Sequence, residues 1–201
     1  MRNIRDLLRG AHYLFNYYIL EKPRGLDFSL RDLSCISNSQ QNGYAMTSDK
    51  AIRNIARKIN FLNKSFLDIG SGKGRVVYQA LKLGAKHAEG VEFSEKLHSI
   101  ASKNFEILGV QKNCISNCID AIKFNRYDEF DIYFLFNPFE NDLYEEVIDC
   151  LMAQVVLNSR NRHIICYGNA NLASIEKYSY VNKVYEGICP HRGNRVVIYS
   201  F

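Results

Sequence analysis

The sequence contains no apolar run that approaches the roughly 20 residues needed to span a bilayer. Its first residues also lack the cleavage signature of a secretory signal peptide. With 201 residues, 47% of them hydrophobic, the chain is large enough to bury one complete core. We therefore expect a soluble, cytoplasmic protein without a membrane span.

The chain also lacks cysteine pairs of the CxxC type, and its five histidines do not cluster with its cysteines. The six cysteines are scattered, several of them in apolar, strand-like runs: Cys35, Cys114, Cys118, Cys150, Cys166 and Cys189. Zinc sites and disulfide frameworks need regular spacings that are missing here. The pattern predicts buried, reduced thiols and no metal site.

No run of five basic residues occurs, although the formal net charge is +5. Proteins that read nucleic acids usually carry a dense basic patch or stripe. The lysines and arginines are spread along the chain, which is typical of a solvated surface. Nucleic acid is therefore not favoured as a partner.

A glycine-rich stretch, FLDIGSGKGRVV at 66–77, is the most informative motif of the sequence. An ATP-binding phosphate loop requires G-x-x-x-x-G-K-[ST]. Alignment on its GK places Leu67 at the first glycine and Gly74 at the magnesium-binding hydroxyl, so this interpretation fails. The dinucleotide fingerprint G-x-G-x-x-G fails as well, because Arg75 stands at its third glycine.

Strand and helix signals alternate from this motif onward. The expected strands are 65–70, 87–93, 114–120, 130–137, 163–169, 178–189 and 195–201, and the expected helices are 49–62, 75–84, 94–109 and 140–157. Such alternation predicts an α/β fold with a mostly parallel sheet between two helical layers. The last two strands have no full crossover helix between them and must pair antiparallel.

Acidic residues close the first three expected strands. Asp68 precedes the helix end that would attract phosphates, and a carboxylate there favours a ligand that carries an ammonium and a sulfonium. Glu92 ends the second strand, where it can accept both hydroxyls of a ribose. The adjacent Phe93 is placed to cover an adenine, and Asp120 with the Ala121 amide is placed to bind the adenine edge.

With the pattern D-x-G-x-G-x-G from Asp68 to Gly74, the chain resembles the class I S-adenosylmethionine-dependent methyltransferases over about residues 44–201. The resemblance implies a Rossmann-like three-layer sandwich whose seven-stranded sheet has an antiparallel last strand. It implies S-adenosyl-L-methionine as the cofactor. The implied cofactor-binding residues are Asp68, Gly70, Ser71, Gly72, Gly74, Glu92, Phe93, Asp120, Ala121 and Asn137.

The fourth strand ends in FLFNPFE, and its Asn137, Pro138 and Phe139 resemble the [DN]-P-P-[YF] motif of amino-group methyltransferases with one proline missing. Together with the upstream GYAMTS, this segment is similar to the small bacterial relatives of the non-SET lysine methyltransferases. That resemblance implies Asn137 and Phe139 as the residues that position the acceptor nitrogen. It also places Tyr44 and Thr47 in a loop over the methionine end of the cofactor.

Residues 1–20 have apolar side chains at helical spacing, with Ile4, Leu7, Leu14, Phe15 and Tyr18 among them. We expect an amphipathic helix that packs beside the cofactor mouth. A homodimer contact and a membrane-surface element are the alternatives. The division expected is 1–47 as an N-terminal helix and loop that form a cap, and 48–201 as the cofactor-binding domain.

These features predict N-methylation of a protein lysine or a small-molecule amine. The acceptor itself, protein or small molecule, is not identified by the sequence. A non-catalytic binding module with the same fold is the alternative from another class, and a nucleic-acid amino methyltransferase is not favoured.

Overall fold

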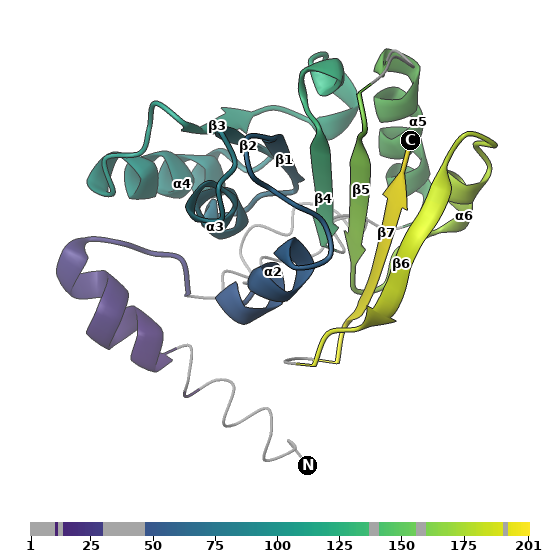
Figure 1. Cartoon of the computed structure of the whole chain (residues 1–201). Helices are drawn as coiled ribbons and strands as arrows, with labels where there is room; N and C mark the ends of the chain where they lie inside the picture. The colour runs from purple at the N-terminus through teal and green to yellow at the C-terminus, as the bar shows by residue number, and fades with distance from the viewer. Residues whose placement is uncertain (1–10, 12–13, 30–46, 137–140, 156–159, 191–192) are drawn as a thin grey trace.

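A computed structural model of the chain describes residues 11, 14–29, 47–136, 141–155, 160–190 and 193–201 (Figure 1). Its centre is a seven-stranded sheet in the order β3-β2-β1-β4-β5-β7-β6. The strands are β1 (Ser65–Ile69), β2 (His87–Glu92), β3 (Cys114–Cys118), β4 (Ile132–Phe136), β5 (His163–Tyr167), β6 (Asn182–Ile188) and β7 (Arg195–Ser200). The pairs from β3 to β5 are parallel, and β7 pairs antiparallel with both β5 and β6. The predicted topology is confirmed.

Helices cover both faces of this sheet, which gives the three layers that the sequence predicts. The helices are α2 (Asp49–Ala56), α3 (Arg75–Lys82), α4 (Glu95–Ile107), α5 (Asn141–Gln154) and α6 (Ala173–Glu176). Strand β4 illustrates why two cores form, since its successive side chains alternate between the faces. Ile132 and Phe134 join the core under α2, α3 and α4, whereas Tyr133 and Leu135 join the core under α5.

Helix boundaries agree with the sequence at their starts and differ at some ends. Ser48 caps α2 by accepting the Ala51 N–H, and Ser94 caps α4 by accepting the Leu97 N–H, as the sequence suggests. Helix α2 ends at Ala56 rather than at residue 62. The chain must turn there to enter β1, and the Asn60 side chain accepts the Leu62 N–H in that turn.

The N-terminal segment is helical as expected in its described part, at residues 11 and 14–21, but its apolar side chains are more exposed than expected. Asn16–Glu21 form a π-helix, and Lys22–Arg24 a single 3-10 turn. Leu14, Phe15 and Tyr18 are about half exposed, at 51%, 56% and 52%. The expected packing of this apolar stripe on the domain is therefore wrong for the part of the stripe that the structure describes; Ile4, Leu7 and Leu8 lie outside that part.

The residues that do pack on the domain come later, in the loop expected at 21–47. Leu26 and Phe28 are buried, and the Phe28 ring stacks on Tyr78 of α3 with 6.1 Å between the ring centroids. Within the described ranges, no helix is both long and apolar enough to cross a membrane.

Candidate functional site

The glycine-rich turn between β1 and α3 lies at the carboxyl ends of the parallel strands, where ligands bind in open α/β sheets. The N–H groups of Gly70 and Ser71 both donate to the Val91 carbonyl of β2, with N–O distances of 2.9 and 3.0 Å. The Gly74 N–H donates to the Ser71 carbonyl at 3.0 Å. These bonds bring the end of β1, the turn and the end of β2 together.

Two glycines are required by close packing around this turn. Gly74 has φ +79°, and a Cβ atom there would overlap the Phe105 ring of α4. Gly90 lies in β2, where a Cβ atom would overlap the Ser71 hydroxyl. Both positions allow neighbouring segments to approach more closely than a side chain would permit.

Glu92 fixes the turn to the end of β2. Its Oε2 accepts the Gly72 N–H at 2.7 Å, and its Oε1 accepts the Ser94 N–H at 2.9 Å. Burial raises the pKa of Glu92, although hydrogen bonds from the backbone N–H groups of Ser94, Gly72 and Phe93 act in the opposite direction. The sequence places Glu92 at the strand end correctly, but spacing alone does not reveal its bond to Gly72.

Asp68 is a buried carboxyl to which the described part of the chain offers no cationic partner. Its side chain is 3% exposed, and no described residue gives it a hydrogen bond or an ion pair. Burial raises the pKa of Asp68 well above its ordinary value, and the charge of Glu92 adds to this shift. Near it, the buried Ser71 hydroxyl has no hydrogen-bond partner among the described residues. The end of β1 therefore carries a buried carboxyl and a buried hydroxyl whose hydrogen bonds the described residues do not satisfy.

Asp120 and Ala121 lie after β3, as the sequence predicts. Asp120 is half-buried, and its Oδ1 accepts the Ile122 N–H at 3.2 Å, which caps a 3-10 turn over Ala121–Lys123. The Ala121 carbonyl accepts the Tyr127 hydroxyl at 2.8 Å. Phe93, at the end of β2, is 53% exposed, so its ring is available to cover a ligand.

Other predicted site residues are placed less fully. Thr47 is buried at 4% exposure, directly before the Ser48 cap of α2. Tyr44, Asn137 and Phe139 lie outside the described residues. The structure therefore brings the predicted cofactor residues of β1, β2 and β3 to one edge of the sheet, while their grouping with the acceptor residues stays a prediction.

Sequence reasoning missed the basic residues of the turn. Lys73 is 2% exposed and forms an ion pair with Asp27, while Arg75 pairs with Glu21 and Asp49. A basic residue between two glycines was the available signal, but its partners are too far along the chain to be found by spacing.

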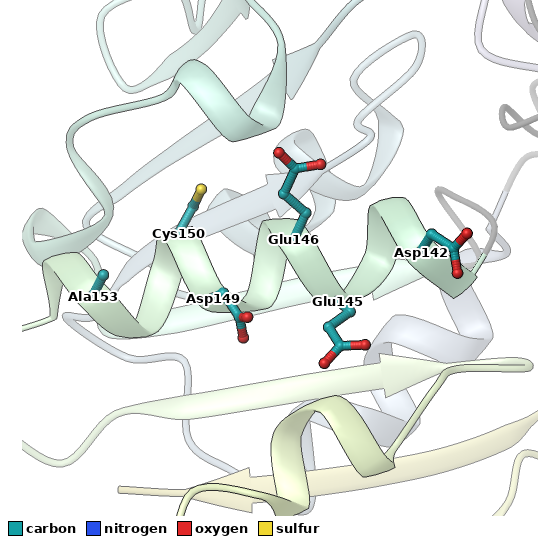
Figure 2. A pocket seen from close by; sticks show the side chains of 6 residues that line it. All are labelled: Asp142, Glu145, Glu146, Asp149, Cys150 and Ala153. Carbon is teal, nitrogen blue, oxygen red and sulfur yellow. The ribbon is translucent and has the colours of Figure 1, made fainter.

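A shallow, open hollow runs along the outer side of α5 (Figure 2). Glu145 and Asp149 leave the helix on one side, and both bind Lys177. Glu146 and Cys150 leave it on the other side, and Asp142 lies in the first turn. The hollow is therefore lined by four carboxylates, two of which pair with Lys177.

A family model described as "Conserved hypothetical protein 95" matches residues 47–190. Among curated proteins, none matches this sequence.

Solved structures of low sequence identity share the architecture. An RNA methyltransferase from Salinibacter ruber, in complex with S-adenosyl-L-homocysteine, has a TM-score of 0.64 at 15% identity and aligns over 78% of this chain and 93% of its own. The putative methyltransferase yhhF from Escherichia coli has a TM-score of 0.63 at 18% identity and aligns over 77% of this chain and 87% of its own. The tRNA methyltransferase TrmK of B. subtilis has a TM-score of 0.63 at 16% identity and aligns over 77% of this chain and 67% of its own. The chain thus has the class I methyltransferase fold.

Proposed function

The chain belongs to the family described as "Conserved hypothetical protein 95", and we propose that it is an S-adenosylmethionine-dependent methyltransferase that methylates an amine. The observation that carries this proposal is the buried carboxyl of Asp68, to which no described residue supplies a cation, beside Glu92 and the glycine-rich turn. A buried carboxylate is stabilised by a positive charge placed next to it. A ligand with an ammonium and a sulfonium supplies that charge, whereas the pyrophosphate of NAD would be repelled.

The residues present fit this cofactor. The buried Ser71 hydroxyl, which has no partner among the described residues, leaves a polar group at the turn for a ligand to satisfy. Asp68 and the turn would hold the methionine end. Glu92 would hold the ribose, since a carboxylate has about four lone-pair positions and three backbone N–H groups contact this one. Asp120, Ala121 and Phe93 would hold the adenine, with Tyr44 and Thr47 over the methionine end.

When bound, the cofactor supplies a methyl group on a good leaving group, so the protein needs to align a nucleophile and exclude water. Asn137 is the residue for this task, because its side-chain oxygen and the Pro138 carbonyl can accept the N–H groups of an amine and direct its lone pair at the methyl carbon. Phe139 would pack against the acceptor. An amine that arrives as an ammonium must first give its proton to water, because only the neutral amine has a lone pair; no general base on the protein is then required.

The acidic face of α5 supports a cationic acceptor, either a protein lysine or a small-molecule amine. Helix α5 begins at Asn141, directly after the NPFE segment, and Asp142 and Glu146 follow in its first turns. Carboxylates there attract an ammonium group and repel the phosphates of a nucleic acid. The similarity of FLFNPFE and GYAMTS to the relatives of non-SET lysine methyltransferases points the same way.

RNA is the second candidate acceptor, because structures with this fold include the RNA methyltransferase of Salinibacter ruber and a tRNA methyltransferase. A non-catalytic module that keeps the cofactor site is a third. The acceptor motif distinguishes the third from the first two, since a protein without catalysis has no need of Asn137.

Calorimetry with S-adenosylmethionine, S-adenosylhomocysteine and NAD tests the cofactor. We expect binding of the first two and none of NAD. Binding of NAD alone would overturn the proposal.

Transfer of a radioactive methyl group to cell extract tests the acceptor. Label in a protein that protease releases as acid-soluble peptides, or label found in the small-molecule fraction before any digestion, supports an amine acceptor. Label that ribonuclease releases supports RNA. Asn137→Ala should cut turnover far more than cofactor affinity, because its contact belongs to the transition state. Equal losses in both would place Asn137 among the cofactor contacts.

A further inference from the structure

Residues 21–29 bind the back of the glycine-rich turn through a buried ion pair. Lys73 stands between Gly72 and Gly74, and its Nζ donates to both carboxylate oxygens of Asp27, at 2.8 and 2.7 Å. The Lys73 side chain is 2% exposed and that of Asp27 is 27% exposed. A buried ammonium loses its hydration, so its position depends on the carboxylate that replaces the water.

Asn104 of α4 holds the two backbones of this pair together. Its Oδ1 accepts the Asp27 N–H at 2.9 Å, and its Nδ2 donates to the carbonyls of Asp27 and Lys73, at 3.0 and 3.1 Å. Asn104 is 1% exposed, so these bonds replace water completely. The segment and the turn are therefore joined by main-chain bonds as well as by charge.

A second ion pair lies at the start of α3. Arg75 donates to Glu21 at 3.0 Å and to Asp49 at 2.8 Å. Glu21 is buried and also accepts the N–H groups of Phe28 and Ser29, each at 2.8 Å. The segment is thus closed on itself by Glu21 and fixed to the domain at both of its ends.

The acids Glu21 and Asp27 precede the region shared with the family, which begins at residue 47. The basic partners, Lys73 and Arg75, lie inside that region. The segment that binds the turn therefore lies outside the region that the family model matches. Movement of Lys73 would displace the neighbouring Gly72, whose N–H binds Glu92.

We propose that residues 21–29 form a positioning segment that sets the geometry of the glycine-rich turn for cofactor binding, with Asp27 as its central positioning residue. This inference rests on the proposed function, because the ligand of the turn is taken to be S-adenosylmethionine or its product. Coupling between two sites is reciprocal, so a ligand whose binding is strengthened by the segment must in turn stabilise the segment.

Hydrogen–deuterium exchange of the full chain, with and without S-adenosylhomocysteine, tests this reciprocity. We expect the ligand to slow exchange at 70–74 and, through the bonds of Asp27 to Lys73 and Asn104, also at 21–29. Protection at 70–74 with none at 21–29 would overturn the inference and leave the proposed function intact. No binding of the ligand at all would overturn both.

Asp27→Asn tests the ion pair by calorimetry. We expect about a tenfold loss of affinity for S-adenosylhomocysteine, faster exchange at 70–74 in the free protein, and partial recovery of both in Asp27→Glu. The matched control is Glu186→Gln on β6, which removes the surface ion pair with Arg195 of β7. It should change neither the affinity nor the exchange at 70–74.

The pair can be removed entirely if Asp27→Asn does not fold. Asp27→Asn combined with Lys73→Met removes both charges of the pair and should recover the stability while the turn still exchanges faster. Unchanged affinity in every folded variant would show that the segment stabilises the domain without positioning the turn.

Discussion

Carboxylates in the parallel part of the sheet and on its antiparallel edge strand are in opposite situations. Asp68 and Glu92, on β1 and β2, are buried, lack basic partners among the described residues, and have pKa values raised first of all by burial. Glu186, on the edge strand β6, is exposed, and hydrogen bonds from Arg195 and Lys183 lower its pKa. No described basic residue faces the first two carboxyls, whereas two basic residues already pair with Glu186.

This difference separates a binding site from a stabilised surface. Exposed ion pairs contribute little to the free energy of unfolding, because water screens their charges. A buried carboxylate without a cation costs stability in the free protein, and natural chains retain such groups at functional sites. Substitutions of Asp68, Glu92 and Glu186 test this difference.

Asp68→Asn should have the largest effect. Removal of the charge should weaken the binding of S-adenosylmethionine by about 3 kcal/mol, since a buried ion pair with the ligand is lost. The same substitution should raise the melting temperature of the free protein, because a buried unpaired carboxylate is replaced by a neutral amide of equal size. Calorimetry and thermal unfolding measure both changes. Lower stability together with unchanged affinity would mean that Asp68 serves only the fold.

Glu92→Ala should weaken cofactor binding by about 1–3 kcal/mol, the usual loss for charge-assisted hydrogen bonds. It also removes the acceptor of the Gly72 N–H, so exchange at the turn should become faster. An unchanged dissociation constant would show that the ribose is held elsewhere.

The pH dependence of stability should show the raised pKa of Asp68. A carboxyl whose folded pKa is raised contributes stability below its unfolded value, and this contribution is lost as the pH rises through the folded value. Starting near pH 4, the free energy of unfolding of the unmodified protein should therefore fall with rising pH relative to Asp68→Asn. Each unit of the shift corresponds to about 1.4 kcal/mol. Parallel curves for the two proteins would contradict the assignment.

Glu186→Gln should have the smallest effect, at the other end of the contrast. Arg195 and Lys183 are exposed and can recover water, so melting temperature and cofactor affinity should both stay within error. A clear loss of cofactor affinity would show that edge strand β6 is coupled to the cofactor site.

Local signals predicted much of this molecule. The apolar runs located all seven strands, and the order of Asp68, Glu92 and Asp120 could be read from strand ends because parallel strands share one carboxyl edge. Ser94 and Gly109 correctly marked the ends of α4, since capping is a local effect.

Long-range partners could not be predicted in the same way. Asp27 lies 46 residues before Lys73, and Glu21 lies 54 residues before Arg75. Nothing in their spacing selects these acids from the others, because the pairing depends on how a loop crosses a completed domain. The apolar stripe at Leu14, Phe15 and Tyr18 misled for a related reason: periodicity indicates an apolar face but does not indicate what covers it.

The reversed direction of β7 gives a practical way to attach the protein to a surface. Ser200 pairs with His163 at the beginning of β5, and the backbone of Phe201 exchanges hydrogen bonds with Arg162. Phe201 therefore lies at the edge where the parallel strands start, opposite the glycine-rich turn (Figure 1). A linker joined after Phe201 would leave the cofactor edge facing solution on a sensor chip, whereas one joined close before Glu21 would strain the segment that holds Lys73.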